Sequence, residues 1–164
     1  MSPRAAWRFE TLGFTDVYDF VPGKAAWLAM GWGREGTAAA TPNVGELVRT
    51  DVPICRLGDT VGDTRRELED STYDFCLLTN EEGIFMGRLR GDALAGDPDA
   101  LVDRAMEGGS STVRPSEHLD GLVKRMTKRG VKSIVVSDLK GKLIGALIRE
   151  DAEKVLEAHQ SDDQ

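Results

Sequence analysis

The sequence predicts a mixed α/β (α+β) fold: two β-α-β-β-α units packed as a pseudo-two-fold pair, preceded by a short helix-strand-helix appendage. The first observation behind this prediction is an internal repeat, because residues 75–83 and 133–141 share an apolar pattern and a final glycine. Residues 84–87 and 142–145 match in the same way, again 58 positions apart. A constant offset indicates a duplicated structural unit. The second observation is that helical and strand periodicities alternate in the same order in both copies.

The second copy, residues 107–158, gives the clearest order of elements. Four apolar residues recur at helical spacing and predict one buried helix face: Leu119, Leu122, Val123 and Met126. Gly130 is expected to end this helix, and Gly141 to allow the turn between two strands. The complete prediction is a strand at 111–115, this helix, strands at 133–137 and 142–148, and a closing helix at about 150–158.

The first copy, residues 52–106, follows the same order. Its expected elements are a strand at 53–57, a helix at 60–69, strands at 74–78 and 84–90, and a closing helix at either 92–94 or 99–106. One unit of this size cannot bury both faces of its sheet, so the two units are expected to pack face to face.

Three further segments flank the repeat. Residues 1–36 contain too little apolar area to fold alone, so we expect them to pack on the repeat, to pair with a second copy in a homodimer, or to be loosely ordered. Their expected elements are a helix at 4–12, a strand at 16–20 and a helix at 24–30. Residues 37–51 are interpreted as a linker, and residues 159–164 as a polar tail.

The composition excludes several classes of function. The formal net charge is -7, and an acidic surface disfavours nucleic acid as a partner. No apolar stretch approaches the roughly 20 residues that cross a bilayer, and the first residues lack a signal-peptide core. A cytoplasmic protein without membrane contact is therefore expected. The two cysteines, Cys55 and Cys76, and the two histidines give no spacing for a disulfide framework or a metal site.

Three motifs of the second copy carry a family resemblance: Thr112-Val-Arg-Pro115, Asp138-Leu-Lys-Gly-Lys-Leu-Ile-Gly145 and the later Asp151. Together with the duplication, they make residues 52–158 resemble a tandem pair of CBS domains. The resemblance implies a regulatory protein that binds an adenine nucleotide between its two units, and it implies homodimerisation. It implies no cofactor and no catalytic residue.

The same family commonly contacts the ribose of its ligand through a G-x-x-T-x-x-D pattern. The counterpart in the second copy runs from Gly145 to Asp151, with Ile148 where the hydroxyl residue is expected. The counterpart in the first copy runs from Gly87 to Asp92, is one residue short and also lacks the hydroxyl. Both copies therefore depart from the family's pattern at the ribose contact.

The residues expected to contact the ligand are Thr112, Val113, Arg114, Asp151 and Asp92. The guanidinium of Arg114 suits a bidentate phosphate contact, although residues 108–115 also suit a plain connection between the two copies. The two aspartates lie near expected helix starts, where a carboxylate stabilises the helix dipole without any ligand.

The N-terminal segment carries a second resemblance. Residues 12–27, followed by Gly31, look like the end of a rhodanese domain, a sulfurtransferase family with a catalytic cysteine just before a helix. The matching helix starts at Ser2, so that cysteine lies outside this chain. Cys76 in an apolar strand and Cys55 beside Arg56 are both interpreted as core residues.

Three hypotheses for the function follow. The first is a regulatory sensor, not an enzyme, that binds a small anionic ligand and foremost an adenine nucleotide. The second is an interaction or dimerisation module whose nucleotide site has decayed, which the missing hydroxyls favour. The third is a sulfurtransferase-related protein whose catalytic half is missing from this chain. The internal repeat favours the first hypothesis, the regulatory sensor.

Overall fold

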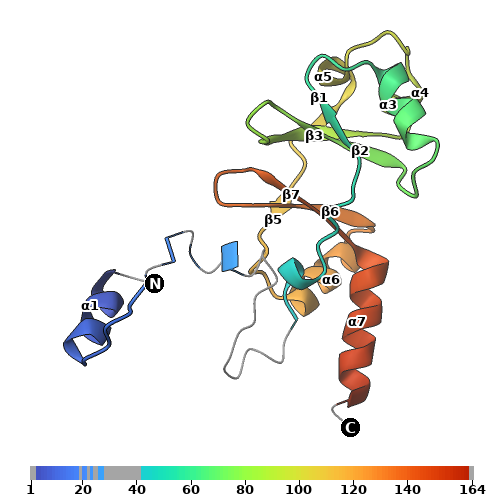
Figure 1. The fold of residues 1–164 in the computed structure, drawn as a ribbon. Coiled ribbons are helices and arrows are strands. Elements are labelled where there is room, and N and C mark those ends of the chain that lie inside the picture. The colour runs from blue at the N-terminus through green and yellow to red at the C-terminus, as the bar shows by residue number, and fades with distance from the viewer. Residues whose placement is uncertain (1–2, 19, 22, 24–25, 28–41, 163–164) are drawn as a thin grey trace.

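Two small sheets lie face to face at the centre of the protein, with helices on their outer sides (Figure 1). The structure, a computed structural model, describes residues 3–18, 20–21, 23, 26–27 and 42–162. The first sheet has the strand order β1-β2-β3-β4, and the second has the order β5-β6-β7. Within the described part of the chain, no helix combines the length and the apolar character that a membrane span needs.

The first sheet and its helices form one unit. Its elements are β1 (Ile54–Arg56), α3 (Val61–Leu68), β2 (Phe75–Thr79), β3 (Phe85–Arg90), α4 (Asp92–Ala95), α5 (Val102–Ala105) and β4 (Glu107–Gly108). Strands β1 and β2 are parallel, and the other two pairings are antiparallel. Both alternatives for the closing helix form, as the short helices α4 and α5.

The second unit has the same plan, as the duplication predicts. Its elements are β5 (Thr112–Val113), α6 (Leu119–Lys128), β6 (Ser133–Ser137), β7 (Leu143–Ile148) and α7 (Arg149–Asp162). The four apolar residues that predict the α6 face are buried. Gly130 and Gly141 have φ of 65° and 84°, so both are in the left-handed region that favours glycine.

The two sheets pack against each other through a shared apolar cluster. It consists of Val52, Phe75 and Leu77 from the first unit, and of Val135 and Ala146 from the second. The two β-turns also pair directly, because Phe85 N–H donates to Gly141 O at 3.0 Å and Leu143 N–H donates to Gly83 O at 2.9 Å. The two donors are 58 positions apart, and so are the two acceptors, so the bonds are related by the pseudo-two-fold axis of the pair.

Part of the segment interpreted as a linker belongs to the second unit. The short helix η2 (Val44–Glu46) buries Val44 completely, in the same cluster as Leu119 and Leu122. Arg49 then pairs with Ala146 at the edge of the second sheet, with N–H to O distances of 2.8 and 3.0 Å. The chain therefore contributes to the second unit before it builds the first.

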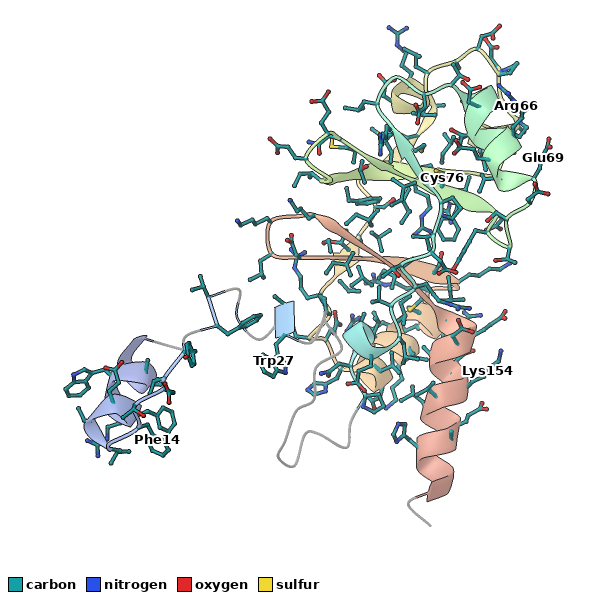
Figure 2. All side chains as sticks on the ribbon, in the orientation of Figure 1. Phe14, Trp27, Arg66, Glu69, Cys76 and Lys154 are labelled. Carbon is teal, nitrogen blue, oxygen red and sulfur yellow. The ribbon has the colours of Figure 1, made fainter. Side chains whose placement is uncertain are left out.

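The N-terminal segment lies to one side of the two sheets, where Phe14 is labelled in Figure 2. Its first helix is present as α1 (Pro3–Thr11). The predicted strand at 16–20 is wrong for the described residues, which form no strand. An isolated strand leaves its backbone groups without partners, and neither sheet pairs with this segment. Of the predicted helix at 24–30, only residues 26 and 27 are described, and both are helical.

Candidate functional site

Two cavities lie where the units meet. The larger has a volume of about 740 Å³ and is lined by β3 of the first unit and by β5, α6 and the start of β6 of the second. The smaller has a volume of about 260 Å³ and lies between the start of β2 and the start of α7. The larger volume is within the range of small-molecule sites, which measure roughly 300–1,000 Å³.

The two cavities occupy equivalent places in the repeat. Residues 72–75 line the smaller cavity, and their counterparts, residues 130–133, line the larger. Likewise, Arg90 lines the larger cavity and its counterpart Ile148 lines the smaller. The duplication has therefore produced the same hollow twice, and the side chains that fill it differ between the copies.

A buried arginine distinguishes the larger cavity. Arg88 on β3 is only 6% exposed, and its guanidinium lies 4.9 Å from the centre of the Phe75 ring. Its Nη1 donates to Ser133 Oγ of the second unit at 3.3 Å, whereas its Nε has no hydrogen-bond partner in the described structure. Burial lowers the pKa of Arg88, but a guanidinium stays charged in proteins. A buried charge without a full set of partners is costly, so this group can gain free energy from an anion.

The other charges on the larger cavity are mostly positive as well. It is lined by five basic residues, Arg88, Arg90, Arg125, Arg129 and Lys132, and by two acidic residues, Asp74 and Glu117. Arg90 pairs with Glu107 at 3.0 Å, and Arg125 pairs with Glu117. The remaining three basic side chains form no ion pair within the described residues. The lining thus carries a net positive charge that suits an anionic ligand.

The smaller cavity is electrically balanced. Its lining has three basic residues, Arg49, Lys132 and Arg149, and three acidic residues, Asp74, Glu150 and Asp151. Arg49 Nε lies 3.1 Å from Asp151 Oδ2, so this carboxylate already has a cationic partner. At its rim, Tyr73 Oη donates to Asp51 Oδ1 at 2.9 Å. Arg149 Nε is buried without a hydrogen-bond partner, as Arg88 Nε is, but it lies 3.4 Å from Glu153 Oε1, so its charge already has an acidic partner.

The structure separates the residues that the sequence predicts as ligand contacts. Thr112 and Val113 line the larger cavity, and Asp151 lines the smaller. Arg114 lines neither, because its Nη1 donates to Ser137 O at 3.1 Å, to Ser137 Oγ at 2.6 Å and to Asp138 O. It therefore ties β5 to the end of β6. Asp92 is exposed on α4 and lines neither cavity.

Sequence reasoning missed Arg88, Arg90, Arg129 and Lys132 as site residues. A signal for Arg88 exists in the repeat, because its counterpart is the small, completely buried Ala146. An arginine at a position that is buried in the other copy indicates a buried charge, and hence a need for a partner.

Neither cysteine has the environment of a nucleophile. Cys55 and Cys76 are 1% and 0% exposed, on adjacent strands of the first sheet, and Figure 2 labels Cys76 there. A hydrogen bond with Cys55, together with burial, raises the pKa of the Cys76 thiol. Both residues are core, as predicted. Among the described residues, no cluster of three or more His, Cys, Asp or Glu side chains could hold a metal ion.

Comparison with known proteins identifies the fold. Residues 102–158 match the model of the CBS domain family. A search of curated protein sequences finds no match to the chain. The resemblance of the N-terminal segment to a rhodanese domain stays a prediction.

Three solved structures illustrate the structural likeness. The cytosolic domain of the Mg2+ channel MgtE in complex with ATP has a TM-score of 0.64 at 23% identity, over 70% of this chain and 48% of that one. The CBS domains of a transcriptional regulator from Streptococcus pneumoniae have a TM-score of 0.64 at 19% identity, over 68% of this chain and 97% of that one. CBSX2 in complex with AMP has a TM-score of 0.65 at 17% identity, over 73% of this chain and 98% of that one. This chain has the fold of a CBS domain pair and spans about half the length of the MgtE domain.

Proposed function

Because the chain has the fold of a CBS domain pair, we propose that it is a regulatory, non-catalytic protein that binds an adenine nucleotide in its larger cavity. One observation carries the proposal: Arg88 is buried on the wall of that cavity with its Nε unpartnered. Phosphate oxygens are the acceptors that a guanidinium binds best. Two similar structures, the MgtE domain and CBSX2, contain ATP and AMP.

The proposed ligand contacts differ from those that the sequence alone favours. Arg88, Lys132 and Arg129 would bind the phosphates, and Thr112 and Val113 would line the same cavity from β5 of the second unit. Asp151 belongs to the smaller cavity and is held by Arg49, so it is not needed in this proposal. The proposed binding module spans residues 42–158, because residues 42–49 complete the second unit.

A nucleotide at Arg88 would connect ligand binding to the packing of the two units. Arg88 belongs to β3 of the first unit and contacts Ser133 on β6 of the second at 3.3 Å. A ligand that satisfies Arg88 Nε in one arrangement of the units favours that arrangement over others. A partner that distinguishes the two arrangements would then respond to the nucleotide.

The test is thermal unfolding of the purified chain with ATP, ADP, AMP and S-adenosylmethionine. A ligand that binds only the folded state raises Tm with its concentration, and saturation at 100 times Kd stabilises by about 2.7 kcal/mol. The proposal predicts that Arg88→Met abolishes the rise and that Asp151→Asn, in the smaller cavity, keeps it. If Asp151→Asn abolished the rise in Tm and Arg88→Met kept it, the nucleotide would bind in the smaller cavity and the proposal would be wrong.

A second candidate is an interaction module without a ligand, and the N-terminal segment favours it. Trp7 and Tyr18 are 63% and 82% exposed, and an exposed apolar surface of this kind suits contact with another protein. We propose a cytoplasmic homodimer as the working form. Light scattering of the intact chain measures the mass. No Tm change with any nucleotide, in a dimeric protein, would favour this second function over the first.

A further inference from the structure

The chain segment that connects the two units passes directly beside Arg88. At its start, Glu107 of β4 pairs with Arg88 of β3. At its end, Thr112 of β5 pairs with Val135 of β6. Residues 108–111 therefore carry the chain from the first sheet to the second, and residues 110–113 line the larger cavity.

Ser110 of this segment lies opposite the residue that Arg88 contacts. Strands β5 and β6 are parallel, so continuing their register back by two residues places Ser110 beside Ser133. Ser133 Oγ accepts the hydrogen bond from Arg88 Nη1 at 3.3 Å. The two strand pairings thus bring the Ser110 hydroxyl to the wall of the cavity on which the buried guanidinium lies.

The two serines of the connection face opposite ways. Side chains alternate along an extended chain, so Ser110 shares a face with Thr112, and Ser111 shares a face with Val113. Val113 is buried in the cluster on the helix side of the second sheet, whereas Val135, the partner of Thr112, belongs to the cluster between the sheets. Ser110 is therefore directed to the side on which the two sheets meet, and Ser111 away from it.

The unpaired charges of the larger cavity match one phosphate monoester. Arg88, Arg129 and Lys132 form no ion pair with a described residue, and neither does Asp74, so these lining residues carry a net charge of about +2. A phosphorylated serine carries about 1.5 to 2 negative charges near pH 7 and has three strong acceptor oxygens. Arg88 Nε, which is buried without a partner in the described structure, lacks such an acceptor.

The backbone around Ser110 is open to a modifying enzyme. Gly108, Gly109 and Ser111 are exposed, and a Cβ on either glycine would meet no atom within 4 Å. The half-buried Ser110 forms no side-chain hydrogen bond with the residues that the structure describes. Glycine has the widest backbone freedom, so the two glycines allow the serine to leave the cavity for an enzyme and to return.

We propose that Ser110 is a phosphorylation site, and that its phosphate binds Arg88 in the larger cavity and excludes the nucleotide from it. In the reaction, the Ser110 hydroxyl oxygen forms a bond to the γ-phosphorus of a nucleoside triphosphate on a separate protein kinase. The bond from that phosphorus to the β,γ-bridging oxygen breaks, the nucleoside diphosphate leaves with the electron pair, and the hydroxyl proton passes to the kinase. The exclusion of the nucleotide rests on the proposed function, whereas the contact between the phosphate and Arg88 does not.

The contact is tested with three forms of the chain: unmodified, phosphorylated at Ser110, and phosphorylated at Ser111 as the matched control of equal charge. Genetically encoded phosphoserine gives both modified forms. Phosphorylation at Ser110 should raise Tm by roughly 4 °C or more, as for a new charge-assisted hydrogen bond between the units, and Arg88→Met should abolish the rise. In a ³¹P NMR titration, the second pKa of this phosphate should lie about one unit below its ordinary value near 6. The Ser111 form should show neither change.

Isothermal titration with ATP tests the exclusion. The chain phosphorylated at Ser110 should bind ATP roughly tenfold more weakly or worse than the unmodified chain, because its own phosphate takes the charge-assisted contacts. The form phosphorylated at Ser111 should bind ATP as the unmodified chain does. Phosphopeptide mapping of the chain isolated from the cells that make it should locate phosphate on Ser110.

The opposite results separate this inference from the proposed function. Equal effects at the two serines, a Tm rise that survives Arg88→Met, or absence of phosphate from Ser110 in both growing and starved cells would overturn the inference. Unchanged ATP binding by the chain phosphorylated at Ser110 would also overturn it and leave nucleotide binding in place. A Tm rise specific to Ser110, in a chain whose unmodified form binds no nucleotide, would support the phosphate contact and overturn the proposed function.

Discussion

Replacing Arg88 by methionine removes a buried charge while keeping the long, flexible apolar stem. In an ordinary core, loss of a completely paired buried ion destabilises the fold by about 3–5 kcal/mol. Arg88 is different, because it has one hydrogen bond at 3.3 Å and an Nε without a partner in the described structure. The substitution therefore removes a cost together with a contact.

The two effects on the free energy of unfolding are similar in size. Removing the unsatisfied buried donor gains about 1–3 kcal/mol. Losing the cation–π contact with Phe75, 4.9 Å from the ring centre, and the long bond to Ser133 costs about 1–3 kcal/mol. We expect Arg88→Met to change stability by less than about 1 kcal/mol, which is less than about 4 °C in Tm for a chain of this length.

Urea unfolding without ligand measures this difference, and Leu89→Ala on the same strand is the reference. Leu89 is completely buried, so its truncation should cost about 2–5 kcal/mol. If Arg88→Met lost as much stability as Leu89→Ala, Arg88 would be a structural residue satisfied within the protein. The case for an anion at its Nε would then be refuted.

Three further predictions concern glycine packing and the cysteines. A Cβ at Gly145 would lie 2.0 Å from Arg49 O, so Gly145→Ala should lose about 3 kcal/mol or more in urea unfolding. Gly87→Ala should lose less stability, because its closest contact is the flexible Met106 side chain and the nearest backbone atom, Glu107 O, is 2.9 Å away instead of 2.0 Å. The helical control Gly121→Ala should gain about 0.5–1 kcal/mol. Because the pKa of the Cys76 thiol is raised in the folded chain, the thiol loses its proton at a lower pH in the unfolded chain than in the folded one. Stability should therefore be intact below about pH 8.5 and fall above it by up to about 1.4 kcal/mol per pH unit, and Cys76→Ala should lack that component of the slope. Finally, neither cysteine should react with a thiol reagent in the folded protein, and rapid labelling of Cys55 would contradict its burial.

Elements with a strong local pattern were predictable from the sequence. The apolar residues of α6 recur at helical spacing, and glycines mark both the end of that helix and the turn before β7. These signals lie within a few residues of one another, so they need no knowledge of the tertiary structure. The repeat then made the arrangement of the second unit a guide to the first.

Features that depend on contacts between distant residues were not predictable in the same way. Val44 is buried against α6, which lies some 75 positions later in the chain, so its segment resembled a linker. Gly87 and Gly145 matched a ribose pattern, yet the structure gives them a packing role, because the backbone of a neighbouring segment lies close to each, at Glu107 and Arg49 respectively. In sequence, Arg88 is one of two basic residues near the end of a strand, and its contact with Ser133 depends on the packing of the second unit.

The most direct measurement is a crystal structure of the chain grown with ATP. We predict one nucleotide in the larger cavity, with phosphate oxygens within hydrogen-bond distance of Arg88 Nε and of Lys132. A nucleotide beside Asp151 in the smaller cavity, with the larger one containing only water, would contradict the proposed site.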